Sequence, residues 1–433
     1  MLRPLLHEWA RYVVAGPGLG LLALYALIVR SRAPQRARRG SKPRLVYGPV
    51  PIINIKYMSR AMAQQGYVAK TFVSHRYDIH VRADFDYYVA DRAVFRLVPQ
   101  RLRGRVIALM GPYVALLWAL PRFDIFHFFF DGGFLQDTPL QFLEVQLLHL
   151  AGKKIVVMPY GSDVAVPTGI RSLIWRHGLM RNYAYLGRQE QQTRRRVQYF
   201  AAHADFIVAC VVHLETLPRW DLLTTHYYPI DTAAWQPGPP GGGYDGKNGP
   251  VTIVHAPNHR GMKGTEFLIA ACRELASEGY QVHLRLLEKV PNRVVQETMR
   301  ESDIVAEQFI AGYALTAMEG MSLGKPVLSN LADDYYYQVH RLYTGLGECP
   351  IVSTPIDQIK NHLRALITNP AWRQQLGAAG RQYVLKYHSY AAMAQLWDAV
   401  YRQIWQGESL ALQEWLPGAP AGYRLPPAET APE

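Results

Sequence analysis

Residues 251–288 read VTIVHAPNHRGMKGTEFLIAACRELASEGYQVHLRLLE and contain an apolar run, a basic turn, an amphipathic segment and a second apolar run. The runs VTIVHA (251–256) and YQVHLRLLE (280–288) predict buried strands, and the segment 265–279 predicts the helix that joins them. Strands that alternate with helices are typical of a parallel sheet with both faces covered. This stretch therefore predicts an α/β domain.

The same alternation extends along the chain on both sides of this stretch. The segment PGPPGGGYDGKNGP (237–250) interrupts it, and so much glycine and proline predicts a linker. The chain therefore predicts two Rossmann-like domains that face each other across a cleft. Further strands are predicted at 44–49, 69–74, 123–130, 153–161, 204–210, 303–309 and 326–330, and further helices at 55–66, 291–302, 313–323, 356–369, 371–386 and 390–405.

The composition supports two packed domains. The chain has 433 residues, of which 49% are hydrophobic and 19% charged, which excludes a single small module and a disordered protein. The three cysteines have neither disulfide nor zinc spacing. We divide the chain into an anchor (1–29), a basic segment (30–43), an N-terminal acceptor-side domain (44–236), a linker (237–250), a C-terminal nucleotide-sugar domain (251–389), a C-terminal helix (390–406) and a proline-rich tail (407–433).

Tyr12–Val29 is an uncharged apolar segment near the N-terminus. As a helix it would be about 27 Å long, which is just enough to cross a bilayer. Basic residues without any acid follow it up to Arg44, and the positive-inside rule then places the domains in the cytoplasm, at the inner membrane. An interfacial anchor and a buried helix are the alternatives. The shorter run Val106–Leu120 predicts a core helix.

The basic turn Pro257–Thr265 follows the strand VTIVHA and precedes a helix. Backbone N–H groups at a helix N-terminus and the cations of Arg260 and Lys263 suit a diphosphate group. The alternative is a basic turn that is simply solvated.

The segment GYALTAMEGMSLGKPVLSN (312–330) strengthens the diphosphate interpretation. With the basic turn, and with PAWRQQLGAAGRQYVLKYHS (370–389), it resembles the C-terminal half of the retaining glycosyltransferases of family 4, also called glycosyltransferase group 1. The N-terminal half resembles them more loosely, through residues 48–67, FDIFHFFF (123–130), the turn at Gly161 and YPID (228–231). The resemblance implies the GT-B fold.

The resemblance also implies roles for single residues. Arg260 and Lys263 would neutralise the donor diphosphate as it leaves, and Glu319 would accept hydrogen bonds from ribose hydroxyls. Glu319 could instead be an ordinary exposed helix carboxylate, and Gly48 an ordinary turn glycine. The implied donor-binding residues are Gly48, Asn258, Gly264, Glu307, Gly312 and Tyr313, and the implied acceptor-side residues are Ser162, Asp163 and Arg171.

Three features depart from the family pattern. Ala311 stands where relatives usually carry a second glutamate, and Glu307 could serve in its place. Tyr160 stands where a histidine often precedes the Gly-Ser-Asp turn, and the arginine-to-lysine spacing of the basic turn is shorter than in many relatives. These departures leave open a second function, a catalytically impaired relative that binds nucleotide sugar or glycan within an assembly complex.

We expect neither a metal nor another cofactor, because the implied fold does not require one. Asp84 and Asp86 have the spacing of the metal-binding pair of the other major glycosyltransferase fold, but the surrounding layout does not match it. His127 lies within an apolar strand and is expected to be a core residue.

The net charge of +13 is concentrated in two segments. Residues 30–44 contribute +7 and residues 171–196 contribute +6, so both favour an anionic membrane surface, with a solvated helix face as the alternative for 171–196. No nucleic-acid module is present, and we expect no nucleic-acid partner. The sequence thus predicts a membrane-anchored glycosyltransferase that transfers a sugar from a nucleotide diphosphate to a lipid-linked or polysaccharide acceptor.

Overall fold

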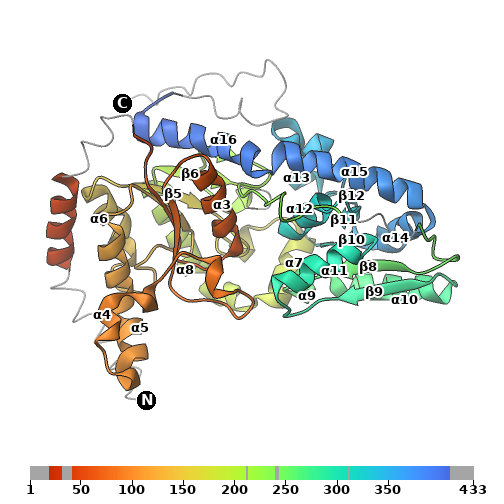
Figure 1. Ribbon diagram of the computed structural model, residues 1–433, viewed down its shortest axis with the longest axis horizontal. Coiled ribbons are helices and arrows are strands. Elements are labelled where there is room, and N and C mark those ends of the chain that lie inside the picture. Colours follow the sequence, from red (N-terminus) through yellow and green to blue (C-terminus); the bar gives the residue numbers. More distant parts are fainter. Residues whose placement is uncertain (1–18, 32–40, 211–212, 239–242, 311, 410–433) are drawn as a thin grey trace.

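The computed structural model describes residues 19–31, 41–210, 213–238, 243–310 and 312–409, which form two parallel sheets that follow one another along the chain (Figure 1). The first sheet has seven strands in the order β3-β2-β1-β4-β5-β6-β7, and the second has five in the order β12-β11-β10-β8-β9. The prediction of an α/β protein with two sheet domains is confirmed.

The first sheet is built on strands that are buried on both faces. All five residues of β4 are buried, and its sequence IFHFF shows no polar alternation, as expected for a central parallel strand. Strand β1 pairs with both β2 and β4, so the strand order reverses at that point. The strands are β1 (Leu45–Tyr47), β2 (Ala69–Val73), β3 (Tyr87–Tyr88), β4 (Ile125–Phe129), β5 (Lys154–Met158), β6 (Phe206–Ala209) and β7 (Leu222–Leu223).

The second sheet reverses its order at β8, which pairs with both β9 and β10. Ligands of open α/β sheets bind beyond the carboxyl ends of the strands, at such reversal points. The strands are β8 (Val251–His255), β9 (Val282–Leu286), β10 (Ile304–Ala306), β11 (Val327–Ser329) and β12 (Val352–Ser353). The two-residue strands β3, β7 and β12 were not predicted from the sequence, because so short a run carries no periodicity.

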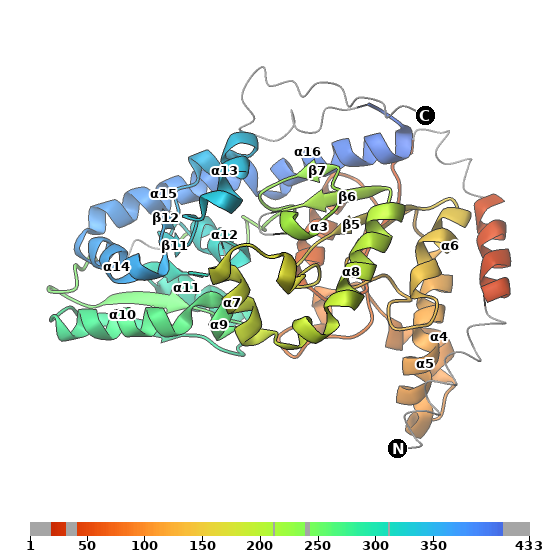
Figure 2. The same ribbon diagram turned by 180° about the vertical axis from the view of Figure 1, so that it is seen from behind.

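Helices cover both sheets (Figures 1 and 2). In the first half they are α3 (Ile53–Gln64), α4 (Ala93–Arg96), α5 (Gln100–Ala119), α6 (Glu144–Leu150), α7 (Leu173–Asn182) and α8 (Tyr185–His203). In the second half they are α9 (Arg260–Lys263), α10 (Thr265–Ser277), α11 (Asn292–Glu301), α12 (Leu315–Ser322), α13 (Asp334–Tyr343), α14 (Ile359–Thr368), α15 (Pro370–Tyr387) and α16 (Tyr390–Tyr401).

The last helix returns to the first sheet. Figure 1 shows α15 along the second half and α16 over the first, where α16 packs against α3. Tyr401 Oη lies 2.9 Å from Tyr47 Oη and 2.9 Å from His127 Nε2, and Trp397 Nε1 donates to the Tyr227 carbonyl at 2.8 Å. His127 is buried, as the sequence predicted, and burial lowers its pKa to about 3. The chain therefore crosses between the two halves twice, and α16 ties them together.

The predicted membrane anchor is only partly described. Residues 1–18 and 32–40 lie outside the described residues, and so do Ala311 and most of the predicted tail, 410–433. The described part is an apolar helix, Leu19–Ser31, which at about 20 Å is shorter than a bilayer span. Its residues Leu22, Ala26 and Val29 are buried in the same apolar cluster as Tyr113 and Leu116 of α5.

Among the described helices, α5 alone is long and apolar enough to cross a membrane, and 28% of its apolar window is buried. The prediction of a core helix at 106–120 is correct only for its C-terminal half, where Ala115, Leu116 and Ala119 are fully buried. No residue of α5 before Gly111 is buried.

The contacts of α16 make a stability prediction. Trp397→Ala removes a side chain that is 1% exposed and leaves a cavity beside His127 and Tyr401, so we expect a loss of about 3–5 kcal/mol. Equilibrium urea unfolding followed by circular dichroism measures this loss. Trp220, which is 42% exposed, provides the control, since Trp220→Ala should change stability by less than about 1 kcal/mol. A loss for Trp397→Ala as small as that expected for Trp220→Ala, below about 1 kcal/mol, would contradict a stabilising role of α16.

Candidate active site between the two sheets

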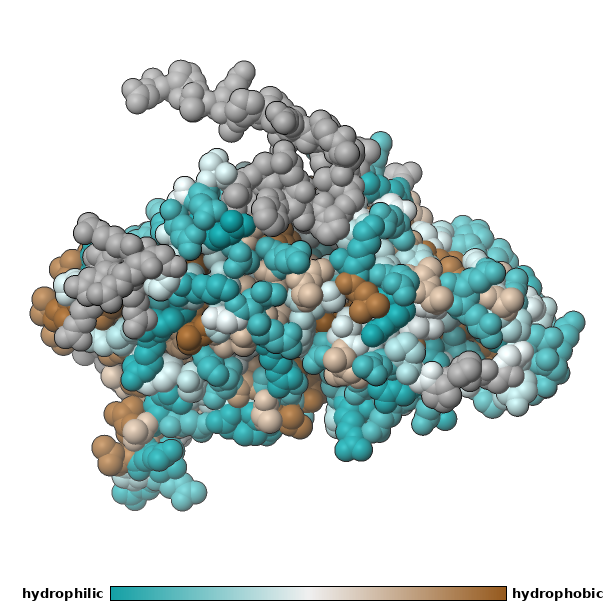
Figure 3. All heavy atoms as spheres, turned by 45° about the horizontal axis from the view of Figure 1, so that its top comes forward, coloured by the Kyte–Doolittle hydropathy of each residue, from teal (hydrophilic) through white to brown (hydrophobic). Residues whose placement is uncertain are grey.

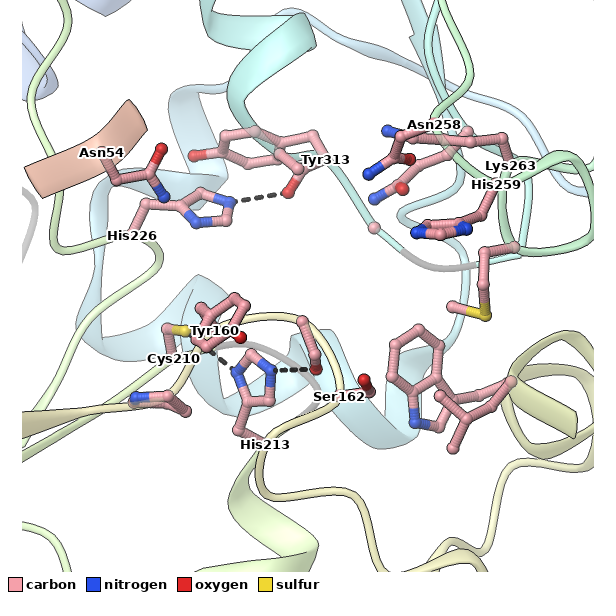
Figure 4. Close-up of a pocket in the computed structure, with 18 of the residues that line it drawn as sticks. Asn54, Tyr160, Ser162, Cys210, His213, His226, Asn258, His259, Lys263 and Tyr313 are labelled. Atoms are coloured by element: carbon pink, nitrogen blue, oxygen red, sulfur yellow. Dashed lines mark hydrogen bonds between the residues drawn. The ribbon is translucent and has the colours of Figure 1, made fainter. Parts of the chain in front are cut away.

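A cavity of about 210 Å³ lies between the two halves (Figure 4). Four loops form most of it, and each follows the carboxyl end of a strand: β5 and β6 in the first sheet, β8 and β10 in the second. Parallel sheets collect such loops on one edge, which explains why distant segments meet here. The lining includes Asn54, Tyr160, Ser162, Trp175, Tyr183, Cys210, His213 and His226 from the first half and Asn258, His259, Lys263, Gln308, Gly312, Tyr313, Ala314 and Tyr337 from the second.

Lys263 supplies a cation to the second-half wall. It ends α9, and Gly264 after it adopts φ 69°, a left-handed conformation that lets the chain turn directly into α10. The Lys263 side chain is 10% exposed, and its Nζ lies 3.3 Å from Glu307 Oε1. Figure 4 shows Lys263 beside Asn258 and His259 on one side of the cavity, with Tyr160, Ser162 and His213 on the other.

Glu307 lies behind Lys263 and does not line the cavity. It directly follows β10, its side chain is fully buried, and its two oxygens accept the Ala314 N–H at 2.9 and 3.0 Å. Ala314 is the N-cap residue of α12, so the carboxylate lies at the positive end of that helix. Burial raises the pKa of Glu307, and the nearby Lys263 and the bound N–H groups oppose the rise. Glu307 therefore acts on the cavity through Lys263 and the start of α12.

Glu319 is also buried and does not line the cavity; it is 4% exposed. Burial and the neighbouring Glu307 charge raise its pKa to about 8, so the group carries a proton at neutral pH. The alternative of an exposed helix carboxylate is wrong. Binding of ribose by Glu319 stays a prediction.

Gly312 and Tyr313 lie at the cavity, in the loop just before α12. A Cβ on Gly312 would lie 1.4 Å from Tyr337 Oη, so no larger residue fits there. The Tyr313 carbonyl accepts a hydrogen bond from His226 Nε2 at 2.6 Å, which joins the α12 loop to the segment that follows β7. Asn258, Gly312 and Tyr313, all predicted donor residues, thus do come together with Lys263.

Arg260 does not join them. Its side chain is 39% exposed, lies outside the cavity lining, and pairs with Glu266 at 2.7 Å and Glu288 at 3.0 Å. Residues three apart on a helix lie on the same face, so the two ion pairs, and not the helix α9, hold the Arg260 side chain away from the cavity. Gly48 is likewise outside the lining: its Cβ would meet the Phe72 carbonyl oxygen at 2.0 Å, so glycine is required there by strand β2 and not by a donor.

Of the three predicted acceptor-side residues, only Ser162 lines the cavity. Ser162 lines the cavity, whereas Asp163 is buried beside it and accepts the Phe130 N–H at 3.0 Å and the Tyr160 N–H at 2.8 Å. Burial and the Asp131 charge raise the pKa of Asp163. Asp163 thus shapes the turn and does not line the cavity. Arg171 lies on the exposed surface, where its N–H donates to Glu215 at 3.1 Å.

Several lining residues were not predicted. The Cys210 thiol lies 3.1 Å from His213 Nδ1, and His213 Nε2 donates to the Gly161 carbonyl at 3.1 Å. Burial lowers the pKa of His213 to about 4 and raises that of Cys210, so both are neutral and Cys210 is no activated nucleophile. Their position at and just after the end of the predicted strand 204–210 was the only sequence signal for them.

No metal centre is found within the described ranges, where no three His, Cys, Asp or Glu side chains group as metal ligands would. Asp84 and Asp86 bind their own domain instead: Asp84 pairs with Lys56 at 2.5 Å, and Asp86 accepts the Thr71 N–H and hydroxyl at 2.9 Å.

The C-terminal half matches a known family. The family described as "Glycosyl transferase-like" matches residues 264–399, which include α10, α12 and α15. These residues are therefore similar to a glycosyltransferase domain, in agreement with the resemblance seen in the sequence. They contain Glu307, Gly312, Tyr313 and Glu319, whereas Lys263 lies one residue before the matched range. No curated protein sequence matches the chain.

Solved structures of other proteins are similar in fold to most of this chain. HepE of Anabaena, solved in complex with UDP-glucose, is 12% identical, with a TM-score of 0.50 over 83% of this chain and 99% of that one. A glycosyltransferase from Rickettsia africae is 10% identical, with a TM-score of 0.48 over 84% of this chain and 98% of that one. The two parallel sheets are consistent with the GT-B fold that the sequence resemblance implied.

The buried Glu319 of this glycosyltransferase domain makes a pH prediction. Because its pKa is about 8 in the folded protein, against the ordinary value of 4.5, folding retains a proton that the unfolded chain releases. This group therefore lowers stability progressively as the pH rises from about 5 to about 8. Glu319→Gln removes this dependence, so its melting temperature relative to the parent should rise over that interval and then level off.

Differential scanning calorimetry at several pH values measures the difference. Glu301→Gln serves as the control, because the Glu301 side chain is 69% exposed. Melting profiles for Glu319→Gln that run parallel to the parent at all pH values would contradict the raised pKa.

Proposed function

We propose that this protein is a retaining glycosyltransferase that transfers a sugar from a nucleotide diphosphate donor to a lipid-linked or polysaccharide acceptor. The observation that supports the proposal is the cavity between the sheets, where the glycosyltransferase domain presents Lys263 and the start of α12 to residues of the first half. A transferase needs such a place, because donor and acceptor must meet away from bulk water.

The donor diphosphate would lie against Lys263 and the N-terminus of α12. The Lys263 cation and the helix dipole would stabilise the charge that collects on the diphosphate as the bond to the sugar breaks. Asn258 lies next to Lys263 in the lining and would donate to the diphosphate or the sugar. Glu319 lies behind the cavity wall, near Glu307 and Lys263, and would accept hydrogen bonds from the ribose only where donor binding opens the wall to it. The nucleotide sugar is a substrate, and no other cofactor takes part in this proposal.

The acceptor would enter from the first half of the molecule. Tyr160 and Ser162 supply hydroxyl groups there, and Trp175 and Tyr183 supply aromatic faces that suit sugar rings. The Tyr160 hydroxyl donates to Asp131 Oδ2 at 2.6 Å, which fixes its direction.

A lipid-linked acceptor agrees with a location at the inner membrane. The apolar segment 12–29 and the basic residues up to Arg44 support this location, with the two domains in the cytoplasm.

A direct assay tests the proposed reaction. The purified protein is mixed with UDP-, GDP- and ADP-linked sugars and a lipid extract of membranes, and the release of nucleoside diphosphate is measured. We expect release with at least one donor, and a product that keeps the anomeric configuration of the donor. UDP-glucose, which the HepE structure holds, is the first probe.

Two variants give this assay its specificity. Lys263→Ala should lower kcat/KM by about 100-fold or more, since it removes a charge-assisted contact from a desolvated site. Arg260→Ala, whose side chain pairs with Glu266 and Glu288 outside the cavity, should lower it by less than about fivefold. Nucleoside diphosphate binding without release, with any donor and extract, would favour the impaired relative that binds but does not transfer.

A further inference from the structure

The segment 92–123 carries positive charge that the two basic segments of the sequence do not include. It contains six arginines and neither aspartate nor glutamate. It forms α4 and α5, at the end of the first half that is farthest from the second sheet (Figures 1 and 2). Arg96, Arg101 and Arg105 are exposed, and none of them forms an ion pair within the described part of the chain.

Large apolar side chains are exposed among these arginines. Leu97 is 86% exposed, the largest exposed fraction of any large apolar residue in the described part of the chain. Val94 and Leu102 are 49% and 42% exposed. A soluble surface rarely gathers such side chains in one place without a partner.

The helix Leu19–Ser31 adds a second apolar surface at the same end of the molecule. Its inner residues are buried against α5, and its outer residues Leu21, Leu24 and Ile28 are 70%, 57% and 47% exposed. Figures 1 and 2 both place this helix at the same end of the molecule as α4 and α5, and Figure 3 shows apolar surface at that end with hydrophilic surface between its two parts. We call α4, the first half of α5 and the outer face of Leu19–Ser31 the end surface.

The basic region 171–196, which the sequence favoured for membrane contact, is less available. Arg194 pairs with Glu190 at 2.8 Å, and Arg196 pairs with Asp131 at 3.6 Å. Arg195 lies over the Phe142 ring at 4.3 Å. Three of the seven arginines of this region thus already have partners inside the protein.

We propose that the end surface docks on an anionic lipid bilayer. Leu97, Val94 and Leu102 would enter the headgroup region, and the arginines around them would bind lipid phosphates through their long side chains. A lipid surface fits better than a protein partner. Arginines and leucines are adjacent in the sequence around the start of α5, as in Arg96-Leu97 and Arg101-Leu102, and a bilayer offers phosphates and apolar chains close together in the same way. The inference rests on the proposed membrane location and not on the sugar transfer.

Docking through the end surface sets the orientation of the enzyme. The end surface and the second sheet lie at opposite ends of the long axis of the molecule (Figure 1). The glycosyltransferase domain would therefore point into the cytoplasm, where nucleotide sugars are dissolved, while the acceptor-side half would rest on the lipid.

A fluorescent label on the full chain tests the docking. Leu97→Cys carries a polarity-sensitive dye, and Leu173→Cys, at a leucine of α7 that is 76% exposed, is the matched control. The unmutated chain gives the background, since only Cys349 of its three cysteines is not buried. Each protein is mixed with phosphatidylcholine vesicles with and without phosphatidylglycerol, and a nitroxide on the lipid headgroup serves as quencher.

We expect a blue shift and quenching at position 97 with the anionic vesicles and neither at position 173. Replacing Arg96, Arg101 and Arg105 by Gln should raise the lipid concentration for the half-maximal shift on the order of 100-fold, as each arginine contributes about fivefold.

The chain could bind vesicles while the label at 97 stays as exposed as the label at 173. This result would contradict docking through the end surface but would not contradict the membrane location. No binding to any vesicle would overturn both. The nucleoside diphosphate assay is separate, so neither result bears on sugar transfer.

Discussion

The candidate site depends on one buried ion pair, Lys263 with Glu307, held at the start of α12. Burying two charges costs free energy unless further hydrogen bonds compensate them, and here the Ala314 N–H supplies such bonds to the carboxylate. The pair joins the loop after β8 to the loop after β10, the two strands at which the second sheet reverses its order. Without Glu307, the Lys263 ammonium would have no fixed direction at the cavity wall. With Glu307, the Lys263 ammonium and the residues just before α12 are held at the same small volume.

The first-half wall of the cavity is held in place by residues that are far away in the sequence. Helix α16 leaves the glycosyltransferase domain and packs on the first half through Trp397 and Tyr401, and the Tyr313 carbonyl binds His226. These contacts join residues far apart in sequence on both sides of the cavity. The contacts of α16 and the Tyr313–His226 hydrogen bond fix the distance between the two walls of the cavity. The same contacts must change if the two halves open to admit a donor.

The parallel strands could be predicted from the sequence. Strands β4, β5 and β8 are buried on both faces, and such strands appear in a sequence as continuous apolar runs. The sequence placed Lys263, Asn258 and Gly312 at the site through a motif. It could not show that Arg260 turns outward, because that depends on Glu266 and Glu288 as partners. It also could not show His213, Cys210 or Tyr337, which reach the cavity only when the sheets meet. The first half of α5 was mistaken for core. A buried helix and an apolar helix at the surface have the same composition, so the sequence alone does not distinguish them.

A crystal structure of the full chain with the best-binding nucleoside diphosphate tests the central claim most directly. We expect the diphosphate between Lys263 Nζ and the first N–H groups of α12, with Arg260 still paired to Glu266. A diphosphate bound elsewhere, with Lys263 held by Glu307 and the cavity empty, would contradict the assignment of this cavity as the donor site.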